Sequence, residues 1–197
     1  MTKLRYSPGS PFGRKAAIAA RHLGLSQVQF IDSEQDSDDR IRKLNPLGKI
    51  PLLVLDDDSV IFDSPVILEY LDALAGGGKI IPTEQKARFR ALTLEALADG
   101  ILEAAILIAY ESRWHAPEAV SDKWIAHQQA KVDAGVAEIE KNPPSGPVDV
   151  GQITLVCTLD FLDKRNGGKW QKTCPKLVAW REQFRKNTPA YSTLPPI

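Results

Sequence analysis

The sequence predicts a small α/β domain, residues 1–78, followed by an all-helical domain, residues 84–197. Strand and helix patterns alternate in the first part, whereas only helical periodicity is found after residue 84. The change comes at three consecutive glycines, 76–78, which end a helix and let the chain turn. The order β-α-β-α-β-β-α expected before them is typical of a mixed sheet with helices packed on it.

The elements of the first domain follow from local patterns. Leu4 and Tyr6 alternate with polar residues, as in a half-buried strand, and apolar runs on both sides of the acidic turn 56–59 indicate a hairpin. Two serine–proline steps each open a helix, because serine offers an N-cap oxygen and proline suits the first helical position. In chain order we expect a strand at 1–6, a helix at 11–23 followed by Gly24, a strand at 28–32, a weak helix or mobile connector at 36–44, strands at 52–55 and 60–62, and a helix at 65–74.

The second domain is expected to contain four helices. The third of them, 149–163, is apolar nearly all round, which predicts a central buried helix. Asp149 and Gln152 form a capping-box pattern at its start. The other three helices are expected at 84–114, 120–141 and 175–184, and the tail that follows is rich in proline.

Composition limits the possible functions. Lysine and arginine number 25, and aspartate and glutamate also number 25, so the chain has no excess of positive charge that would favour nucleic acid or an anionic membrane. No apolar stretch is long enough to span a membrane, and no residues have the spacing of metal ligands. Cys157 is expected to be buried and Cys174 exposed. Two cysteines without metal or redox spacing predict a reducing, cytoplasmic setting.

The most informative feature of the chain is a set of three short segments. Ser10-Pro11 and Ser64-Pro65 place a hydroxyl at the start of two helices, and the glycine–proline run 45–51 lies between them. The start of a helix offers unpaired N–H groups and a partial positive charge. Such positions hold anions, a thiolate or a carboxylate among them.

In their order and setting these segments resemble the bacterial cytosolic glutathione S-transferase family, and the resemblance covers essentially the whole chain. Residues 6–15 are similar to the serine-type, theta/omega-like N-terminal motif, 45–51 to the loop that carries a cis-proline, and 63–71 to the start of the γ-glutamyl-binding helix. The family's C-terminal capping motif usually has Ser or Thr first and Asp last. Asp149 and Gln152 depart from that residue pattern but can form the same capping hydrogen bonds. The resemblance implies a thioredoxin-like first domain and an all-α second domain.

The resemblance also implies roles for residues of the first domain. Ser10 is the expected catalytic residue, with its hydroxyl bound to the glutathione sulfur. Pro51 should be cis, which leaves the backbone of Ile50 free to pair with the cysteinyl part of the tripeptide. The remaining glutathione contacts implied are Ser64 to the γ-glutamyl carboxylate, Asp63 to the γ-glutamyl amine and Lys49 to the glycine carboxylate.

In the second domain the resemblance implies an electrophile site and a dimer contact. The electrophile is expected beside Phe12, against Tyr110 and Trp114, which lie four residues apart on one helical face. A symmetric homodimer is expected to pack across the long helix. Asp99 is then a candidate to reach the amine of a glutathione bound by the partner subunit.

Thiol activation by a serine is energetically sufficient. A free thiol has a pKa of about 8.5, and each unit of lowering requires about 1.4 kcal/mol. The start of a helix supplies about 0.3–1 kcal/mol and one hydrogen bond to a charged group about 1.5–3 kcal/mol. Together they lower the thiol pKa by roughly one to three units, so Ser10 needs no general base.

Each of these residues also has a purely structural interpretation. Both serines would then be helix caps, Lys49 a solvated lysine, and the aromatic pair core or dimer contacts. Asp99 would lie with Glu95 and Glu103 on a solvated helix face.

The predicted function is a detoxifying glutathione transferase that conjugates glutathione, its co-substrate, to small hydrophobic electrophiles without a metal. The alternative is a non-catalytic binding or regulatory protein of the same fold. A disulfide reductase is disfavoured, because a serine cannot form the mixed disulfide that a cysteine would.

Overall fold

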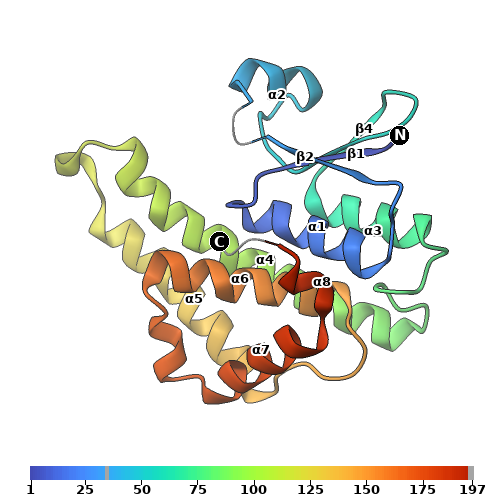
Figure 1. Ribbon diagram of the computed structural model, residues 1–197. Coiled ribbons are helices and arrows are strands. Elements are labelled where there is room, and N and C mark those ends of the chain that lie inside the picture. The colour runs from blue at the N-terminus through green and yellow to red at the C-terminus, as the bar shows by residue number, and fades with distance from the viewer. Residues whose placement is uncertain (34–35, 195–197) are drawn as a thin grey trace.

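The computed structural model describes residues 1–33 and 36–194, and in it a small mixed sheet lies beside a larger group of helices (Figure 1). The sheet has the order β2-β1-β3-β4. β1 pairs in parallel with β2 and antiparallel with β3, and β3 pairs antiparallel with β4. The strands are β1 (Lys3–Tyr6), β2 (Gln29–Asp32), β3 (Leu52–Val54) and β4 (Val60–Ile61). The predicted fold class of the first part is confirmed.

Helices cover both faces of this sheet. Figure 1 shows α1 (Pro11–His22) and α3 (Ser64–Leu74) on one side and α2 (Asp38–Leu44) on the other. α1 ends at His22, one residue before the predicted end, and Gly24 follows its C-cap as predicted, with a φ of 68° and an N–H that donates to the Arg21 carbonyl at 3.1 Å. The segment expected as a weak helix or connector is a helix, because the Ser37 hydroxyl accepts from the Arg40 N–H at its start.

The start of α3 differs from the prediction by one residue. Asp63 occupies the N-cap position and makes no side-chain capping bond, so Ser64 is the first residue of the helix rather than its cap. Proline is accepted at either of the first two helical positions, because neither N–H is bonded within the helix. A serine–proline step therefore does not tell a capping serine from a first helical one.

The second part of the chain is entirely helical. Its helices are α4 (Gln85–Trp114), α5 (Asp122–Lys141), α6 (Val150–Asn166) and α7 (Pro175–Asn187), with three short helices that were not predicted: η1 (Pro117–Ala119), η2 (Lys169–Lys172) and α8 (Pro189–Ser192). Every residue of α6 from 150 to 162 is buried, which confirms the predicted central helix. Asp149 caps it by accepting from the Gln152 N–H at 2.9 Å, whereas the Gln152 side chain donates to the Pro147 carbonyl.

The two parts share one apolar core. Leu4 of the sheet belongs to the same buried cluster as Ile153 and Val156 of α6. The linker between the parts is held by Asp72, a buried carboxylate of α3 that accepts from three consecutive N–H groups, 78–80, at 2.7–2.8 Å. The sheet and the helices are therefore packed as one body.

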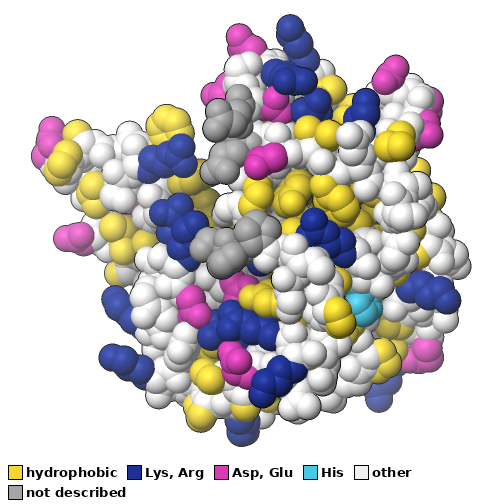
Figure 2. Space-filling model, in the orientation of Figure 1, with side chains coloured by type: hydrophobic (Ala, Val, Ile, Leu, Met, Phe, Trp, Pro, Cys, Tyr) yellow, Lys and Arg dark blue, Asp and Glu magenta, His cyan; other side chains and the backbone are white. Residues whose placement is uncertain are grey.

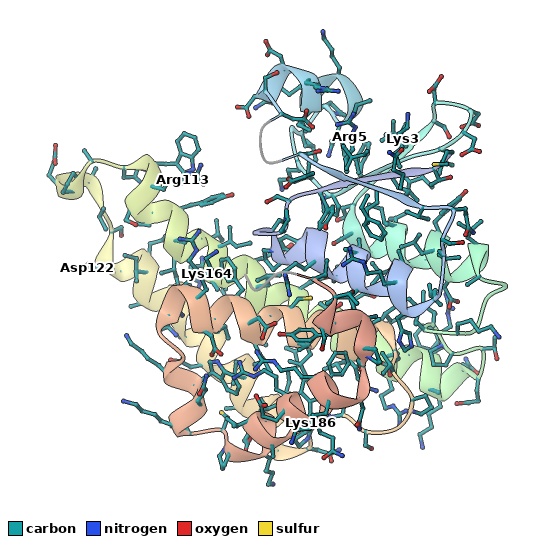
Figure 3. The ribbon with its side chains drawn as sticks, in the orientation of Figure 1. Lys3, Arg5, Arg113, Asp122, Lys164 and Lys186 are labelled. Atoms are coloured by element: carbon teal, nitrogen blue, oxygen red, sulfur yellow. The ribbon has the colours of Figure 1, made fainter. Side chains whose placement is uncertain are left out.

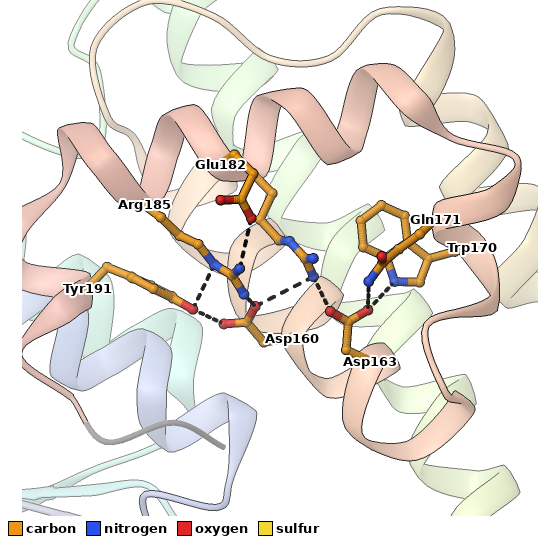
Figure 4. A network of polar contacts seen from close by, with 8 residues as sticks. Asp160, Asp163, Trp170, Gln171, Glu182, Arg185 and Tyr191 are labelled. Carbon is orange, nitrogen blue, oxygen red and sulfur yellow. Dashed lines mark hydrogen bonds and ion pairs between the residues drawn. The ribbon is translucent and has the colours of Figure 1, made fainter.

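A polar network ties the last helices to α6 (Figure 4). Asp160 accepts from Arg185 at 2.7 Å and from the Tyr191 hydroxyl at 2.6 Å, and Arg181 pairs with Asp163. Burial, together with the bond to Asp160, raises the pKa of Tyr191 to about 12. Through these contacts α8 is held against α1.

Both cysteines are free and buried, so the expectation that Cys174 is exposed is wrong. Cys174 packs in the second core cluster beside Trp170 and Leu177, because η2 folds the loop inward. Cys157 lies in the middle of α6, where burial raises the pKa of its thiol. Among the described residues no helix is long and apolar enough to cross a membrane.

The close contact between α4 and α6 generates a test. A Cβ added at Gly151 would lie 2.7 Å from the Ala91 carbonyl oxygen and 2.8 Å from Leu94 Cβ. Gly151→Ala is therefore expected to lower the free energy of unfolding by about 1–3 kcal/mol, measured by urea denaturation.

Gly100→Ala is the matched control, since a Cβ there meets nothing within 4 Å. It is expected to raise the free energy of unfolding by up to about 1 kcal/mol through helix propensity. Equal effects of the two substitutions would contradict the packing described.

Candidate functional site

The three segments singled out in the sequence meet at one edge of the sheet. β1 and β4 are both antiparallel to β3, so they run in the same direction. α1 follows β1 and α3 follows β4, and both helices therefore begin at the same edge. β3 runs the opposite way and begins there too, directly after Pro51. Topology alone brings the two helix starts and the proline loop together.

Ser10 is the N-cap of α1, as predicted. Its Oγ accepts from the Gly13 N–H at 3.3 Å. A hydroxyl that accepts one hydrogen bond keeps its own proton to donate. Ser10 is partly exposed, so that O–H is available to an anion at the start of α1.

The proline loop has the predicted geometry. The Ile50–Pro51 peptide bond is cis and Pro51 is buried. The Asn45 side chain orders the loop by donating to the Lys49 carbonyl and accepting from the Leu47 N–H, both at 3.0 Å. No described residue hydrogen-bonds the N–H or C=O of Ile50, so this donor and acceptor are free to pair with an extended peptide.

The start of α3 offers a second set of donors. Ser64 is buried, and its hydroxyl has no hydrogen-bond partner in the part of the chain that the structure describes. The first intrahelical bond is made by Ile67, which leaves the N–H groups of Ser64 and Val66 unbonded within the helix. Asp63 is exposed beside them. This arrangement suits a carboxylate with a cationic group next to it.

A buried lysine lies behind the start of α1. The Lys15 side chain is fully buried, and its Nζ lies 2.7 Å from Asp99 Oδ2 and 3.3 Å from Glu95 Oε1. It also lies 6.0 Å from the centre of the Phe12 ring. The solvated-face interpretation of Asp99 and Glu95 is therefore wrong, whereas Glu103 is exposed as that interpretation expects.

The cluster around Lys15 contains more carboxyl groups than ammonium groups. Burial raises the pKa of Glu95 and of Asp99, and the Lys15 ammonium opposes the rise in both. The charge of Asp63 contributes to the rise at both carboxyls, so the start of α3 is electrostatically coupled to this cluster. Three acids around one lysine leave net negative charge, which favours a further cation such as an ammonium group.

The aromatic residues expected at the electrophile site are spread along the cleft. Phe12 is half-buried and packs against the core of the helical part. Tyr110 is 45% exposed and Trp114 is 69% exposed, so neither is a core residue. Tyr110 lies 11 residues beyond Asp99 on α4, or about 16 Å along the helix. Arg113 covers both of these rings, with its guanidinium carbon 5.8 and 5.6 Å from their centres.

Sequence reasoning missed Lys15 and Arg113. Lys15 directly precedes the apolar run 16–20, a position from which a buried ammonium needs carboxylate partners. Glu95 and Asp99, four residues apart on a long helix, supply them. Lys49 is exposed and makes no ion pair with a described residue. No group of three described His, Cys, Asp or Glu residues is arranged to hold a metal.

Comparison with known proteins matches both the sequence and the fold. The family model of the glutathione S-transferase N-terminal domain matches residues 9–74. A glutathione transferase family member from Pseudomonas fluorescens Pf-5 is 35% identical, with all of both chains covered and a TM-score of 0.91 with glutathione bound. The same protein has also been solved with S-(propanoic acid)-glutathione, at a TM-score of 0.87.

Two further relatives match over nearly the full chain. A glutathione S-transferase from Methylobacillus flagellatus KT, with glutathione bound, is 28% identical, with all of both chains covered and a TM-score of 0.91. The uncharacterized GST-like protein YibF of Escherichia coli K12 is 28% identical over 199 residues, covering 95% of this chain and 98% of YibF.

Removal of the buried lysine is expected to destabilise the chain. Lys15→Met leaves Glu95 and Asp99 without their cation and is expected to lower the free energy of unfolding by about 3–5 kcal/mol at pH 8. The folded variant then takes up protons at both carboxyls, whereas the unfolded chain releases them above about pH 4.5. Stability therefore falls as the pH rises, and the loss should be smaller at pH 5 than at pH 8.

Urea denaturation at the two pH values measures this difference. Lys86→Met, at an exposed lysine of α4 without an ion pair to a described residue, is the control and should change stability by less than about 0.5 kcal/mol at either pH. A loss for Lys15→Met that is the same at both pH values would contradict the assignment of the buried charges.

Proposed function

This chain belongs to the glutathione S-transferase family, and we propose that it binds glutathione at the shared sheet edge and conjugates its thiol to small hydrophobic electrophiles. The observation that carries the proposal is the set of free groups at that edge: the Ser10 hydroxyl, the Ile50 backbone and the Ser64 hydroxyl with its neighbouring N–H groups. Glutathione is bound in the structures of the relatives from Pseudomonas and Methylobacillus, which supports it.

Each part of the tripeptide has a counterpart on this edge. The cysteinyl backbone pairs with Ile50 as an added strand. The γ-glutamyl carboxylate accepts hydrogen bonds from the donors at Ser64. The γ-glutamyl amine pairs with Asp63, and Asp99 adds negative charge behind Asp63. Lys49 is exposed in the loop, and we assign it to the glycine carboxylate.

Ser10 is the proposed catalytic residue. Its hydroxyl donates to the glutathione sulfur, and the start of α1 adds a partial positive charge, so the thiolate is favoured and the thiol proton passes to water. The sulfur then forms a bond to the electrophilic carbon, which either loses its leaving group as an anion, such as chloride, or passes a π pair to the neighbouring carbon, which takes a proton from water. Attaching a charged tripeptide makes an apolar electrophile water-soluble, which is the chemical basis of a detoxifying role. Free, buried cysteines support a reducing, cytoplasmic setting.

We further propose that the protein is a homodimer. The Arg88–Glu69 ion pair, at 3.0 Å, places the start of α4 beside α3. Next to it, Phe89 is 59% exposed and Val66 is 48% exposed. A large apolar group on each of two neighbouring helices is typical of a surface that a second copy covers.

Two serine substitutions are expected to separate binding from activation. Ser64→Ala removes a hydrogen bond to a charged group and should weaken glutathione binding about tenfold to a hundredfold in titration calorimetry. Ser10→Ala should leave that affinity within about threefold. It should raise the pKa of the bound thiol by roughly one to two units, which is read from thiolate absorbance against pH.

The matching rate measurement uses 1-chloro-2,4-dinitrobenzene, with Ser7→Ala as control, because Ser7 is a neighbouring hydroxyl in the same loop. Ser10→Ala should lower kcat/KM about tenfold to a hundredfold at pH 7 and the control by less than about threefold. Glutathione binding with turnover unaffected by Ser10→Ala would contradict the catalytic role. Binding without any turnover would favour the non-catalytic alternative.

The dimer is tested by its mass in solution. Phe89→Glu places a charge where an apolar contact is proposed and should shift a dimer of about 43 kDa, twice the 21.7 kDa chain, to the monomer in sedimentation velocity. Glu118→Gln, at an exposed position of η1, is the control and should stay dimeric. A wild-type monomer at micromolar concentration would overturn this proposal.

A further inference from the structure

The helical wall of the cleft carries two cations that glutathione binding does not use. Figure 3 labels them: Arg113 in the last turn of α4 and Lys164 in the last turn of α6. Both side chains are exposed. Figure 2 shows the hollow between the protruding end of α4 and the sheet domain, with apolar side chains inside and Lys and Arg side chains along one wall.

Helix geometry places both cations on the wall that continues from α1. On α4 the Asp99 side chain points toward α1, because it binds Lys15. Each residue of a helix turns by about 100°, so the side chains of Tyr110 and Arg113 leave α4 within about 40° of the direction of Asp99. On α6, Cys157 faces α1, since it belongs to the same buried cluster as residues 16–20 of that helix. Lys164, two turns further on, lies within about 20° of that direction.

α4 and α6 lie side by side along this wall. The Thr158 hydroxyl donates to the Ala98 carbonyl at 3.1 Å, and Gly151 contacts Ala91. Residues of α6 therefore lie opposite the residues of α4 that are 60 positions earlier in the chain. By the same helix geometry, Arg113 leaves α4 on the side nearer to α6, whereas the exposed Glu103 leaves it on the side away from α6. By the same offset Lys164 is level with Ala104, nine residues or about 14 Å before Arg113 along α4. The two cations therefore lie at successive levels of the same wall.

No described residue neutralises either cation. In the described part of the chain no carboxylate lies within ion-pair distance of Arg113 or Lys164. The neighbouring acids are engaged elsewhere. Glu111 is buried and accepts from the Ser121 N–H at 3.0 Å, and Asp163 binds Arg181 and the Trp170 ring N–H.

We propose that the preferred electrophiles are anionic: an aromatic or apolar body that carries a carboxylate. The body lies along α4 between Phe12 and Tyr110, and the carboxylate faces Arg113, with Lys164 at an intermediate level of the same wall. Stacking on Tyr110 and Trp114 preorganises the Arg113 guanidinium, and a guanidinium matches a carboxylate with two parallel hydrogen bonds. The inference rests on the proposed function, because it assigns the specificity of the same site.

The chemistry is tested with an electrophile whose reacting carbon and carboxylate lie at opposite ends of a ring. In ethacrynic acid the glutathione sulfur bonds to the terminal methylene carbon. The π pair of the carbon–carbon double bond moves to the carbon beside the ketone, and that carbon then takes a proton from water. Nothing is oxidised or reduced, no group leaves, and the carboxylate is untouched. The methyl ester is the matched neutral substrate.

The measurement is kcat/KM for the acid and for the ester, each divided by its uncatalysed rate constant. We expect the acid to be preferred about tenfold, because a partly desolvated charge pair contributes about 1.4 kcal/mol. The double variant Arg113→Gln, Lys164→Gln should bring the acid-to-ester ratio to within about twofold of one. Salt at 0.5 M should lower the wild-type ratio, because it screens the charges.

Lys186→Gln is the control. Lys186 is also an exposed lysine in the last turn of a helix, α7, but Figure 3 shows it on the far side of the helical part. It should leave both the ratio and the turnover unchanged. An acid-to-ester ratio near one for the wild type, or a ratio that the double variant does not change, would overturn the inference. Turnover of the ester in the same experiment would still support the proposed function.

A second readout decides the case in which neither substrate turns over, an outcome that would overturn the proposed conjugation. The glutathione conjugates of the acid and of the ester are then prepared chemically and titrated into the protein by calorimetry. Tighter binding of the acid conjugate, lost in the double variant, supports recognition of the anion. Equal affinities, or no binding of either conjugate, would overturn it.

Discussion

The buried ammonium of Lys15 is the interaction on which the geometry of the site depends. A fully buried lysine is costly unless it is paired, and both of its carboxylate partners, Asp99 and Glu95, belong to α4. Lys15 therefore ties α1 to the middle of α4, whereas the main packing of α1 is against α6 and α3. Ser10 and Phe12 lie about one turn before Lys15, so the start of α1 is held close to the middle of the long helix. The same cluster adds negative charge beside the start of α3, so one set of contacts both joins the two parts of the chain and polarises the site.

The rest of the glutathione edge follows from strand direction. Because β1 and β4 both run antiparallel to β3, the two helix starts and the cis-proline loop are brought to one edge without any contact between their side chains. Asp72 then holds the linker that leads into α4, and Asp149 caps the central helix, whose first N–H donates to the Ile80 carbonyl of that linker at 3.0 Å. Each of these groups satisfies backbone donors where the chain changes direction.

The two walls of the cleft differ in how firmly they are built. Ser10, Pro51 and Ser64 belong to the wall packed on the shared core, and in the proposed function they recognise glutathione, the constant co-substrate. Tyr110, Arg113 and Trp114 project from the free end of α4, beyond its contact with α1, and are exposed to solvent. Substitutions at that end leave the core unchanged. If the proposed function holds, specificity for the electrophile depends on the most exposed part of the cleft, where the charge of the wall matters as much as its aromatic rings.

The sequence by itself determined the order of the longer elements, the caps at Ser10 and Asp149 and the buried character of α6, because each depends on residues within a few positions of one another. The cis state of Pro51 was expected from the resemblance to a known family and not from the local residues. It placed Ser64 one residue too early in its helix, since proline fits either helical position. Asp99 and Glu95 read as a solvated stripe, and Cys174 as exposed. Only the tertiary structure gave Asp99 and Glu95 their lysine, buried Cys174 under η2 and set Arg113 and Lys164 on one wall. The physical reason is that burial and charge pairing depend on residues 18 to 84 positions apart, which local periodicity does not relate.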